Sequence, residues 1–176
     1  MLNILISAEK IKERVSELAK EISRDYKNKE LLIIGILKGS FIFASDLIRL
    51  LDLNEILKVH IDFLKVSSYK DTKSTGKIQV IQDMAEDIHK KHVLIIEDIV
   101  DTGLTVQKII KDLQEQNPES IEICTLLNKP SKRKNSFYIK YKGFDIEDLF
   151  VVGYGLDYNQ EYRNFPEIRI FEEKKL

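Results

Sequence analysis

Residues 93–105 read Val-Leu-Ile-Ile-Glu-Asp-Ile-Val-Asp-Thr-Gly-Leu-Thr, and this stretch decides the fold. Its first four residues form a short, mostly β-branched apolar run, which predicts a strand buried on both faces of a parallel sheet. Two acids, Glu97 and Asp98, follow directly, and a third, Asp101, opens a short turn before a helical pattern begins. Because parallel strands present ligand-binding groups at their carboxyl ends, we expect a site where this strand ends, near Ile96.

Predicted strands and helices alternate on both sides of this stretch. The first predicted helix is capped by Ser7 and ends before Asn28. Further helices are predicted at about residues 41–51 and 105–116, and further strands at residues 31–37, 57–63, 77–82 and 121–127. This alternation predicts an α/β fold with a mostly parallel central sheet flanked by helices. Short strands predicted at residues 137–141, 149–154 and 168–171 indicate a small appended subdomain.

Composition sets the outer bounds of the prediction. The chain has 176 residues, of which 43% are hydrophobic, and this suits one well-packed domain. A formal net charge of −1 gives no general attraction to nucleic acid or to an anionic membrane. The longest apolar stretch, residues 31–37, is too short to span a bilayer, and a single cysteine, Cys124, is typical of a reduced, cytosolic protein. We therefore expect a cytoplasmic protein without nucleic-acid or membrane partners.

The turn at residues 102–105 carries two hydroxyls and successive backbone N–H groups at the start of a predicted helix. Unpaired N–H groups and the helix dipole converge there, and Gly103 lets a ligand approach the backbone, so the turn suits a phosphate. Glu97 and Asp98 could accept hydrogen bonds from vicinal sugar hydroxyls and help to hold Mg²⁺. An acidic strand end and a capped helix would explain any one of these residues alone. Their combination favours a ribose 5-phosphate site.

The segment at residues 97–105 resembles the phosphoribosyl-pyrophosphate signature of the type I phosphoribosyltransferases. Leu37-Lys38-Gly39-Ser40 resembles the pyrophosphate loop of that family, Ser67-Ser68-Tyr69 its flexible lid, and Leu127-Asn128-Lys129-Pro130 its purine-contacting lysine segment. Residues 150–158, with Arg163 after them, are similar to the hood of hypoxanthine(-guanine) phosphoribosyltransferases. The resemblance covers nearly the whole chain, and its short form looks bacterial.

The resemblance implies a single phosphoribosyltransferase domain over residues 1–176. Its core would span about residues 28–130, and its hood would come mainly from about residues 131–176 with a contribution from the N-terminus. The implied activity is purine salvage: Mg²⁺-dependent transfer of the phosphoribosyl group from phosphoribosyl pyrophosphate to hypoxanthine, and to guanine, which gives IMP or GMP and pyrophosphate. A homodimer or homotetramer is expected from the family.

For the activated sugar, the resemblance implies a cluster of residues from separate loops. The sugar phosphate would be bound by Glu97, Asp98, Asp101, Thr102, Gly103, Leu104 and Thr105. Pyrophosphate would be bound by Lys38, Gly39 and Arg163, and the family has a cis peptide bond at Leu37-Lys38. Magnesium would be held by Glu97, Asp98 and Asp157.

For the base, the resemblance implies selection by hydrogen bonds beside a stacking platform. The purine would stack on Phe150 and contact Val151, Lys129 and Asp157. Lys129 as a donor favours 6-oxopurines, because adenine would present a donor to a donor. Asp101 would act as the general base near the purine N7.

Residues 67–77 are rich in Ser, Thr, Lys and Asp, which predicts a mobile loop. It is longer than most connections in compact domains. The resemblance implies that the part with Ser68 and Tyr69 closes over the site and keeps water from the activated sugar.

Some residues depart from the family or have no predicted role. Asn128 stands where bacterial members usually carry an aspartate, and residues 132–134 are unusually basic. His60, His89 and His92 show no metal-ligand spacing, so we assign them no role. Two alternatives stay open: a regulator of the same fold that binds RNA or DNA, which should carry a basic face, and a transferase for adenine, xanthine or a pyrimidine.

Overall fold

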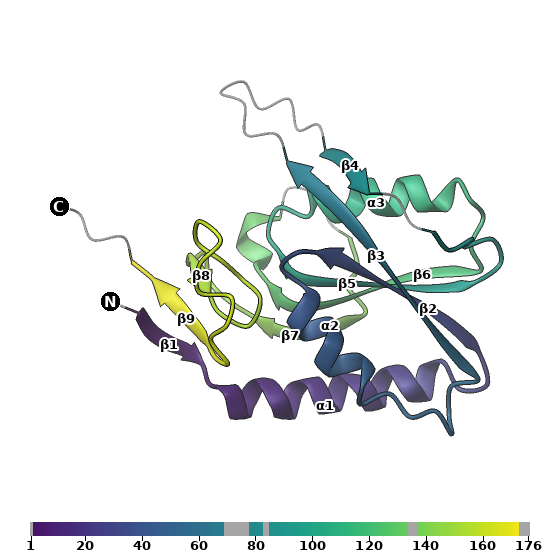
Figure 1. Cartoon of the computed structure of the whole chain (residues 1–176), viewed down its shortest axis with the longest axis horizontal. Coiled ribbons are helices and arrows are strands. Elements are labelled where there is room, and N and C mark those ends of the chain that lie inside the picture. Colours follow the sequence, from purple (N-terminus) through teal and green to yellow (C-terminus); the bar gives the residue numbers. More distant parts are fainter. Residues whose placement is uncertain (1, 69–77, 83–84, 134–136, 173–176) are drawn as a thin grey trace.

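The computed structural model describes residues 2–68, 78–82, 85–133 and 137–172. The main sheet has the strand order β4-β3-β2-β5-β6-β7 (Figure 1). Its strands are β2 (Glu30–Leu37), β3 (Lys58–Ser68), β4 (Ile78–Gln82), β5 (His92–Val100), β6 (Ser120–Asn128) and β7 (Tyr141–Asp145). Neighbouring strands pair in parallel, except that β4 is antiparallel to β3. The predicted α/β fold with a mostly parallel sheet is confirmed.

Helices cover both faces of this sheet. One face packs against α1 (Ala8–Asp25) and α2 (Phe41–Ile48), and the other packs against α3 (Leu104–Gln114). Successive residues of β2 serve the two layers in turn, since Ile33 joins the α1 and α2 core while Ile34 joins the α3 core, and both are 0% exposed. Burial on both faces therefore explains the unbroken apolar run of this strand. None of the helices in the described ranges combines the length and apolarity that crossing a bilayer requires.

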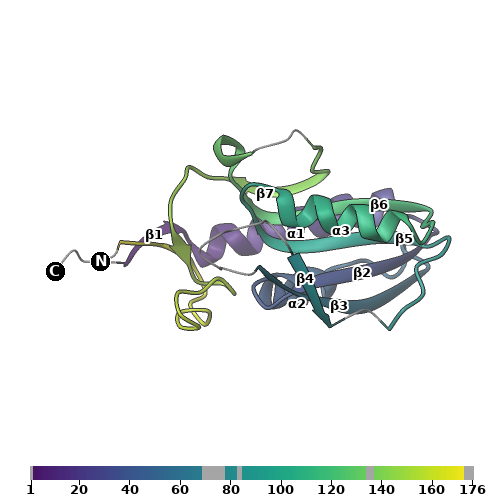
Figure 2. The same cartoon turned by 90° about the horizontal axis from the view of Figure 1, so that it is seen from above.

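A smaller antiparallel sheet lies beside the core and contains the first and the last strand of the described residues (Figures 1 and 2). Its order is β1-β9-β8, with β1 (Leu2–Ile6), β9 (Ile168–Phe171) and β8 (Val151–Val152). The first strand of the chain therefore pairs with the last. Because β8 pairs with β9 and β9 pairs with β1, these two strands position the segment that follows Val152.

The tail of the chain divides between the two sheets, which differs from the prediction. The strand predicted at residues 137–141 lies instead at Tyr141–Asp145, where it pairs in parallel with β6 at the edge of the main sheet. Tyr141 at its start is 2% exposed and joins the core under α1. Burial of this large side chain explains why the strand begins there. Within the described residues after Pro130, β8 and β9 are the strands that enter the smaller sheet.

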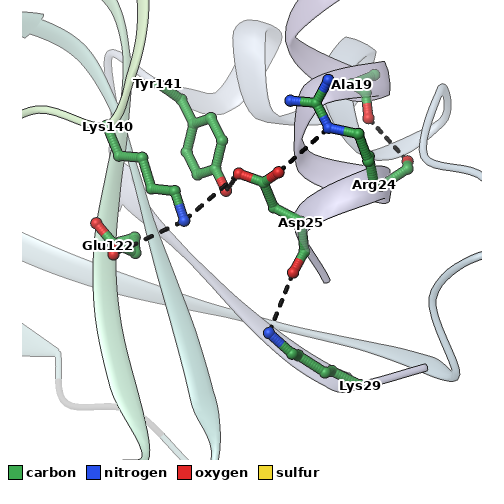
Figure 3. Close-up of polar contacts among 8 residues, drawn as sticks. Ala19, Arg24, Asp25, Lys29, Glu122, Lys140 and Tyr141 are labelled. Carbon is green, nitrogen blue, oxygen red and sulfur yellow. Dashed lines mark hydrogen bonds and ion pairs between the residues drawn. The ribbon is translucent and has the colours of Figure 1, made fainter. Parts of the chain in front are cut away.

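A polar cluster ties the end of α1 to β7 at the amino-terminal end of the main sheet (Figure 3). Tyr141 Oη donates to Asp25 Oδ2 at 3.0 Å, and Lys140 Nζ lies 3.4 Å from the same oxygen. Lys29 Nζ donates to the Asp25 carbonyl oxygen at 3.1 Å. Burial disfavours the charged form of Asp25, but the Tyr141 hydrogen bond and the Lys140 charge outweigh it and lower the pKa of this carboxyl.

We expect Asp25→Asn to lower the free energy of unfolding by about 1 kcal/mol at pH 7, because the hydrogen bond and ion pair to the carboxylate are lost. The folded-state pKa of Asp25 lies below its value in the unfolded chain, about 3.9. Its contribution is therefore fully present above pH about 4 and is lost as the pH falls through the folded-state pKa. Urea unfolding of both proteins from pH 7 to pH 3 should show the difference shrinking toward low pH.

Glu17→Gln is the matched control for this experiment. Glu17 lies on the same helix and pairs with Arg14 at 2.7 Å, but its side chain is 54% exposed. An exposed pair of this kind contributes little, so we expect a much smaller change in stability. A difference between Asp25→Asn and wild type that stays constant down to pH 3 would contradict the role given to the carboxylate.

Candidate functional site

The sheet brings three loops to one edge, at the carboxyl ends of its central strands. The loop after β2 begins at Lys38, the turn after β5 begins at Asp101, and Lys129 follows β6. β2, β5 and β6 are neighbours in the sheet and run in parallel, so these loops lie side by side. This edge is where open parallel sheets bind ligands.

β5 continues past the point where we expected it to end. It runs to Val100 rather than ending near Ile96, and Glu97 and Ile99 pair in register with β6. The two apolar residues after the acids explain the extension, because they keep the strand buried. Glu97 and Asp98 are consequently part of the strand and are held by its backbone, while Asp101 is the first residue beyond it.

The Asp98 side chain and the Oε2 atom of Glu97 are buried at the end of β5. No hydrogen-bond partner for Glu97 Oε2 occurs within the described part of the chain. Burial and the adjacent Asp98 raise the pKa of the Glu97 carboxyl well above its ordinary value. Burial also raises the pKa of Asp98 to about 6, opposed by the backbone N–H of Ile99 and by the charge of Arg163. Buried carboxyls in this state favour an added cation or hydroxyl donor.

The turn after β5 has the backbone expected of an anion site. Gly103 has φ +80° and is the N-cap of α3, so the cap residue supplies no side-chain acceptor, and Thr102 Oγ1 accepts from the Leu104 N–H at 3.4 Å. The first N–H groups of a helix have no intrahelical acceptor, so they are available to a ligand. A Cβ at Gly103 would lie 2.3 Å from Phe137 Cε1 and 2.8 Å from Arg133 Nη1, so a larger residue would have to displace these side chains and would be strained at this φ. Thr102 and Thr105 lie on either side of this glycine.

The loop after β2 packs directly against Asp98 and the segment after β8. The peptide bond at Leu37-Lys38 is cis, as the resemblance implies. A Cβ at Gly39 would lie 1.7 Å from Asp98 Oδ2, and a Cβ at Gly155 would lie 2.1 Å from the Gly39 carbonyl oxygen. Two glycines therefore allow the loop, the buried acid and the segment after β8 to meet.

Arg163 and Asp157 join this cluster from the segment after β8. Arg163 Nη2 lies 2.8 Å from Asp157 Oδ1, and Arg163 Nη1 donates to the Gly155 carbonyl oxygen at 2.6 Å. Gln160 Oε1 accepts from both Lys38 Nζ at 3.1 Å and Arg163 Nη2 at 3.2 Å. One neutral oxygen thus joins the charged ends of Lys38 and Arg163, two of the residues that we predicted to bind pyrophosphate. The sequence pattern gave no signal for Gln160, which lies in a segment of left-handed backbone at Asn159, Gln160 and Tyr162.

Two of the residues predicted to bind the base, Lys129 and Phe150, lie directly after β6 and directly before β8. Lys129 is only 7% exposed, and its Nζ lies 3.6 Å from Asp148 Oδ1. Phe150 is 53% exposed and packs edge-on against Tyr158 and Phe171, with ring centroids 5.8 Å away in each case. The burial of Lys129 was not expected for the start of a basic loop. Asp148 was missed because nothing in its local sequence links it to a lysine nineteen positions away.

The lid prediction falls partly outside the described residues, and two residues without a predicted role lie away from the cluster. Ser68 is the last residue of β3, and Tyr69 lies outside the described residues. His92 Nδ1 lies 2.8 Å from Ser120 Oγ at the opposite end of the strands, and Cys124 is buried in the core. The part of the chain that the structure describes has no group of three or more His, Cys, Asp or Glu side chains arranged to hold a metal without other ligands.

Comparison with known proteins gives one consistent family. Residues 3–159 match the phosphoribosyl transferase domain. The hypoxanthine-guanine phosphoribosyltransferase of Staphylococcus aureus (strain Mu50) is 48% identical over 166 residues, which cover 94% of this chain and 90% of that protein. The enzyme of the same name from Staphylococcus epidermidis is 47% identical over 167 residues, 94% of this chain and 91% of that one.

Solved structures agree with the sequence relatives. A crystal structure of a hypoxanthine-guanine phosphoribosyltransferase from Bacillus anthracis superimposes with a TM-score of 0.90 at 43% identity, covering 97% of this chain and 98% of that chain. A hypoxanthine phosphoribosyl transferase from Trypanosoma cruzi gives 0.89 at 37% identity, covering 97% and 91%. The chain therefore belongs to the phosphoribosyl transferase family, in which it is similar to hypoxanthine-guanine phosphoribosyltransferases.

Proposed function

We propose that the protein transfers the phosphoribosyl group from phosphoribosyl pyrophosphate to hypoxanthine and to guanine, giving IMP or GMP and pyrophosphate. The observation that carries this proposal is the meeting of two different subsites at one edge of the sheet. The turn at residues 102–105 and the buried acids suit a sugar phosphate, while the buried cation Lys129 suits the exocyclic oxygen of a purine. The names of the bacterial relatives support the same activity.

In this proposal the activated sugar lies along the end of β5. Its 5-phosphate binds the N–H groups and hydroxyls of residues 102–105, and its hydroxyls donate to Glu97 and Asp98. The buried, unpartnered Glu97 Oε2 supports an incoming donor or cation at this place. Lys38, Gly39 and Arg163 bind the pyrophosphate, which replaces the Gln160 oxygen between the two cations.

Magnesium fits the donor set in this arrangement. The ion prefers oxygen ligands and binds through one or two carboxylates together with substrate phosphates and water. Glu97, Asp98 and Asp157 supply carboxylates beside the proposed pyrophosphate position, and Asp157 and Asp98 are close enough to influence each other's charge. When bound, the ion would neutralise charge on the departing pyrophosphate.

The base would lie between Phe150 and the turn after β5. Phe150 offers an exposed ring face for stacking, and Val151 contacts the ring edge through its backbone. Lys129 donates to the 6-oxo group, and burial excludes the water that would otherwise compete. Asp101, which is exposed at the start of the turn, accepts the proton from the purine N7 as the new bond forms.

We propose further that the protein is a single-domain, cytoplasmic oligomer. One domain carries both a core and a hood, and Ser68 and Tyr69 belong to a loop that closes during turnover. The protein acts in the cytoplasm as a homodimer or homotetramer.

A panel of bases tests the proposed substrate class. With Mg²⁺ and phosphoribosyl pyrophosphate, we expect formation of nucleoside monophosphate from hypoxanthine and guanine, and little or none from adenine or uracil, measured by chromatography. Xanthine, the third 6-oxopurine, completes the panel. Tight binding of phosphoribosyl pyrophosphate without turnover of any 6-oxopurine would contradict the proposed activity and favour a regulator.

Asp101→Asn tests the proposed general base. The amide keeps the size of the side chain but cannot accept the proton, so kcat should fall by roughly 10²- to 10⁴-fold while the KM for phosphoribosyl pyrophosphate changes little. The matched control is Asp112→Asn, an exposed aspartate of α3 that pairs with Lys108 and should leave both constants unchanged. Equal losses in kcat and in sugar binding for Asp101→Asn would argue against proton transfer.

A further inference from the structure

Arg133 reaches from the loop after β6 to the turn that we propose as the 5-phosphate site. Its guanidinium stacks on Phe137, with Cζ 4.2 Å from the ring centroid. Its Nη1 lies 2.8 Å from the position that a Cβ would take at Gly103. The side chain therefore lies against the backbone of the turn.

The two ends of this guanidinium differ in their partners. Nη2 donates to Asn128 Oδ1. Nη1 is buried, yet no acceptor for it lies within the described ranges. A buried N–H donor without an acceptor is unfavourable, and a charged donor more so. An acceptor atom of a bound ligand would satisfy the Nη1 donor of Arg133.

Asn128 holds Arg133 in place without cancelling its charge. Its amide accepts from Arg133 and donates to Asp145 Oδ1 at 2.5 Å, and the residue is 6% exposed. A carboxylate at this position would face the negatively charged Asp145 and would neutralise the guanidinium locally. The neutral amide avoids both effects, so the positive charge of Arg133 remains available at the turn.

We propose that Arg133 is a further binding residue of the sugar-phosphate site, whose Nη1 donates to the 5-phosphate bound at residues 102–105. This proposal rests on the proposed function and adds one charged donor to the backbone N–H groups of the turn. Arginine suits this task because its planar fork can hold Asn128 with one nitrogen and a phosphate oxygen with the other. Stacking on Phe137 fixes the direction of the fork.

Loss of Arg133 should weaken the binding of ligands that carry the 5-phosphate more than the binding of ligands that lack it. For Arg133→Met, which keeps an unbranched apolar stem beside Phe137, we expect the Kd for IMP to rise at least about tenfold, as for the loss of a hydrogen bond to a charged group. The Kd for inosine should change less than about twofold, because inosine lacks the phosphate. Isothermal titration calorimetry with both ligands gives the IMP-to-inosine ratio directly, and the KM for phosphoribosyl pyrophosphate should rise in parallel.

Two further variants control for charge and for folding. Arg24→Met removes one positive charge from an exposed side chain of α1, 77% accessible, and should leave the ratio unchanged. Arg133→Lys retains the charge but loses the fork, so it should recover part of the IMP affinity that the methionine variant loses. If the methionine variant does not fold, as judged by thermal unfolding, the lysine variant carries the test with a several-fold loss of IMP affinity.

The outcomes distinguish this proposal from the one on which it depends. A wild-type protein that binds IMP no more tightly than inosine would contradict the phosphate site itself, and with it the role of Arg133. A wild-type protein that discriminates, together with an unchanged IMP-to-inosine ratio in folded Arg133→Met, would overturn the role of Arg133 alone. Equal weakening of both ligands would also overturn it, because a structural role in the turn would affect both.

Discussion

The site depends on the burial of two adjacent carboxyl groups, Glu97 and Asp98, at the end of β5. Each group has a raised pKa, because the interior disfavours its charge. Ionising these groups without a ligand therefore opposes folding, and the chain must supply this cost from packing elsewhere. A strand end that served stability alone would not place two acids there. In the proposed site a cation and sugar hydroxyls would make the arrangement favourable, which supports the proposal that the two acids form half of a binding site.

Close packing at two glycines fixes the position of Asp98 relative to the rest of the site. Its carboxylate occupies the space that a side chain at Gly39 would need, and the carbonyl of Gly39 occupies the space beside Gly155. The hood segment is therefore placed on the loop after β2 by backbone packing, independently of any charged pair. The smaller sheet strengthens this placement, since β8 pairs with β9, and β9 pairs with the N-terminal strand β1.

Periodicity predicted the fold correctly because both cores are built from uninterrupted strand and helix patterns. The predicted strand bounds were wrong at the end of β5 and at the start of β7. β5 runs on to Val100 because apolar Ile99 and Val100 follow the acids, and a polar pair inside a buried strand resembles its end. The strand near residue 141 was displaced because Tyr141 is buried under α1, which local sequence does not reveal. Contacts between distant loops, such as Lys129 with Asp148, depend on tertiary placement that no spacing encodes.

The cations of the site are held before any substrate arrives. Lys129 faces Asp148, Arg163 faces Asp157, and Lys38 shares the oxygen of Gln160 with Arg163. Each partner can be exchanged or shared. Asp148 lies 3.6 Å from Lys129, Asp157 is also a proposed magnesium ligand, and Gln160 is neutral. Partners of this kind fix the direction of long side chains and so reduce the entropy that binding would otherwise remove. The polar neighbours of the proposed site therefore orient the side chains of its cations before binding, and the substrate then supplies stronger acceptors.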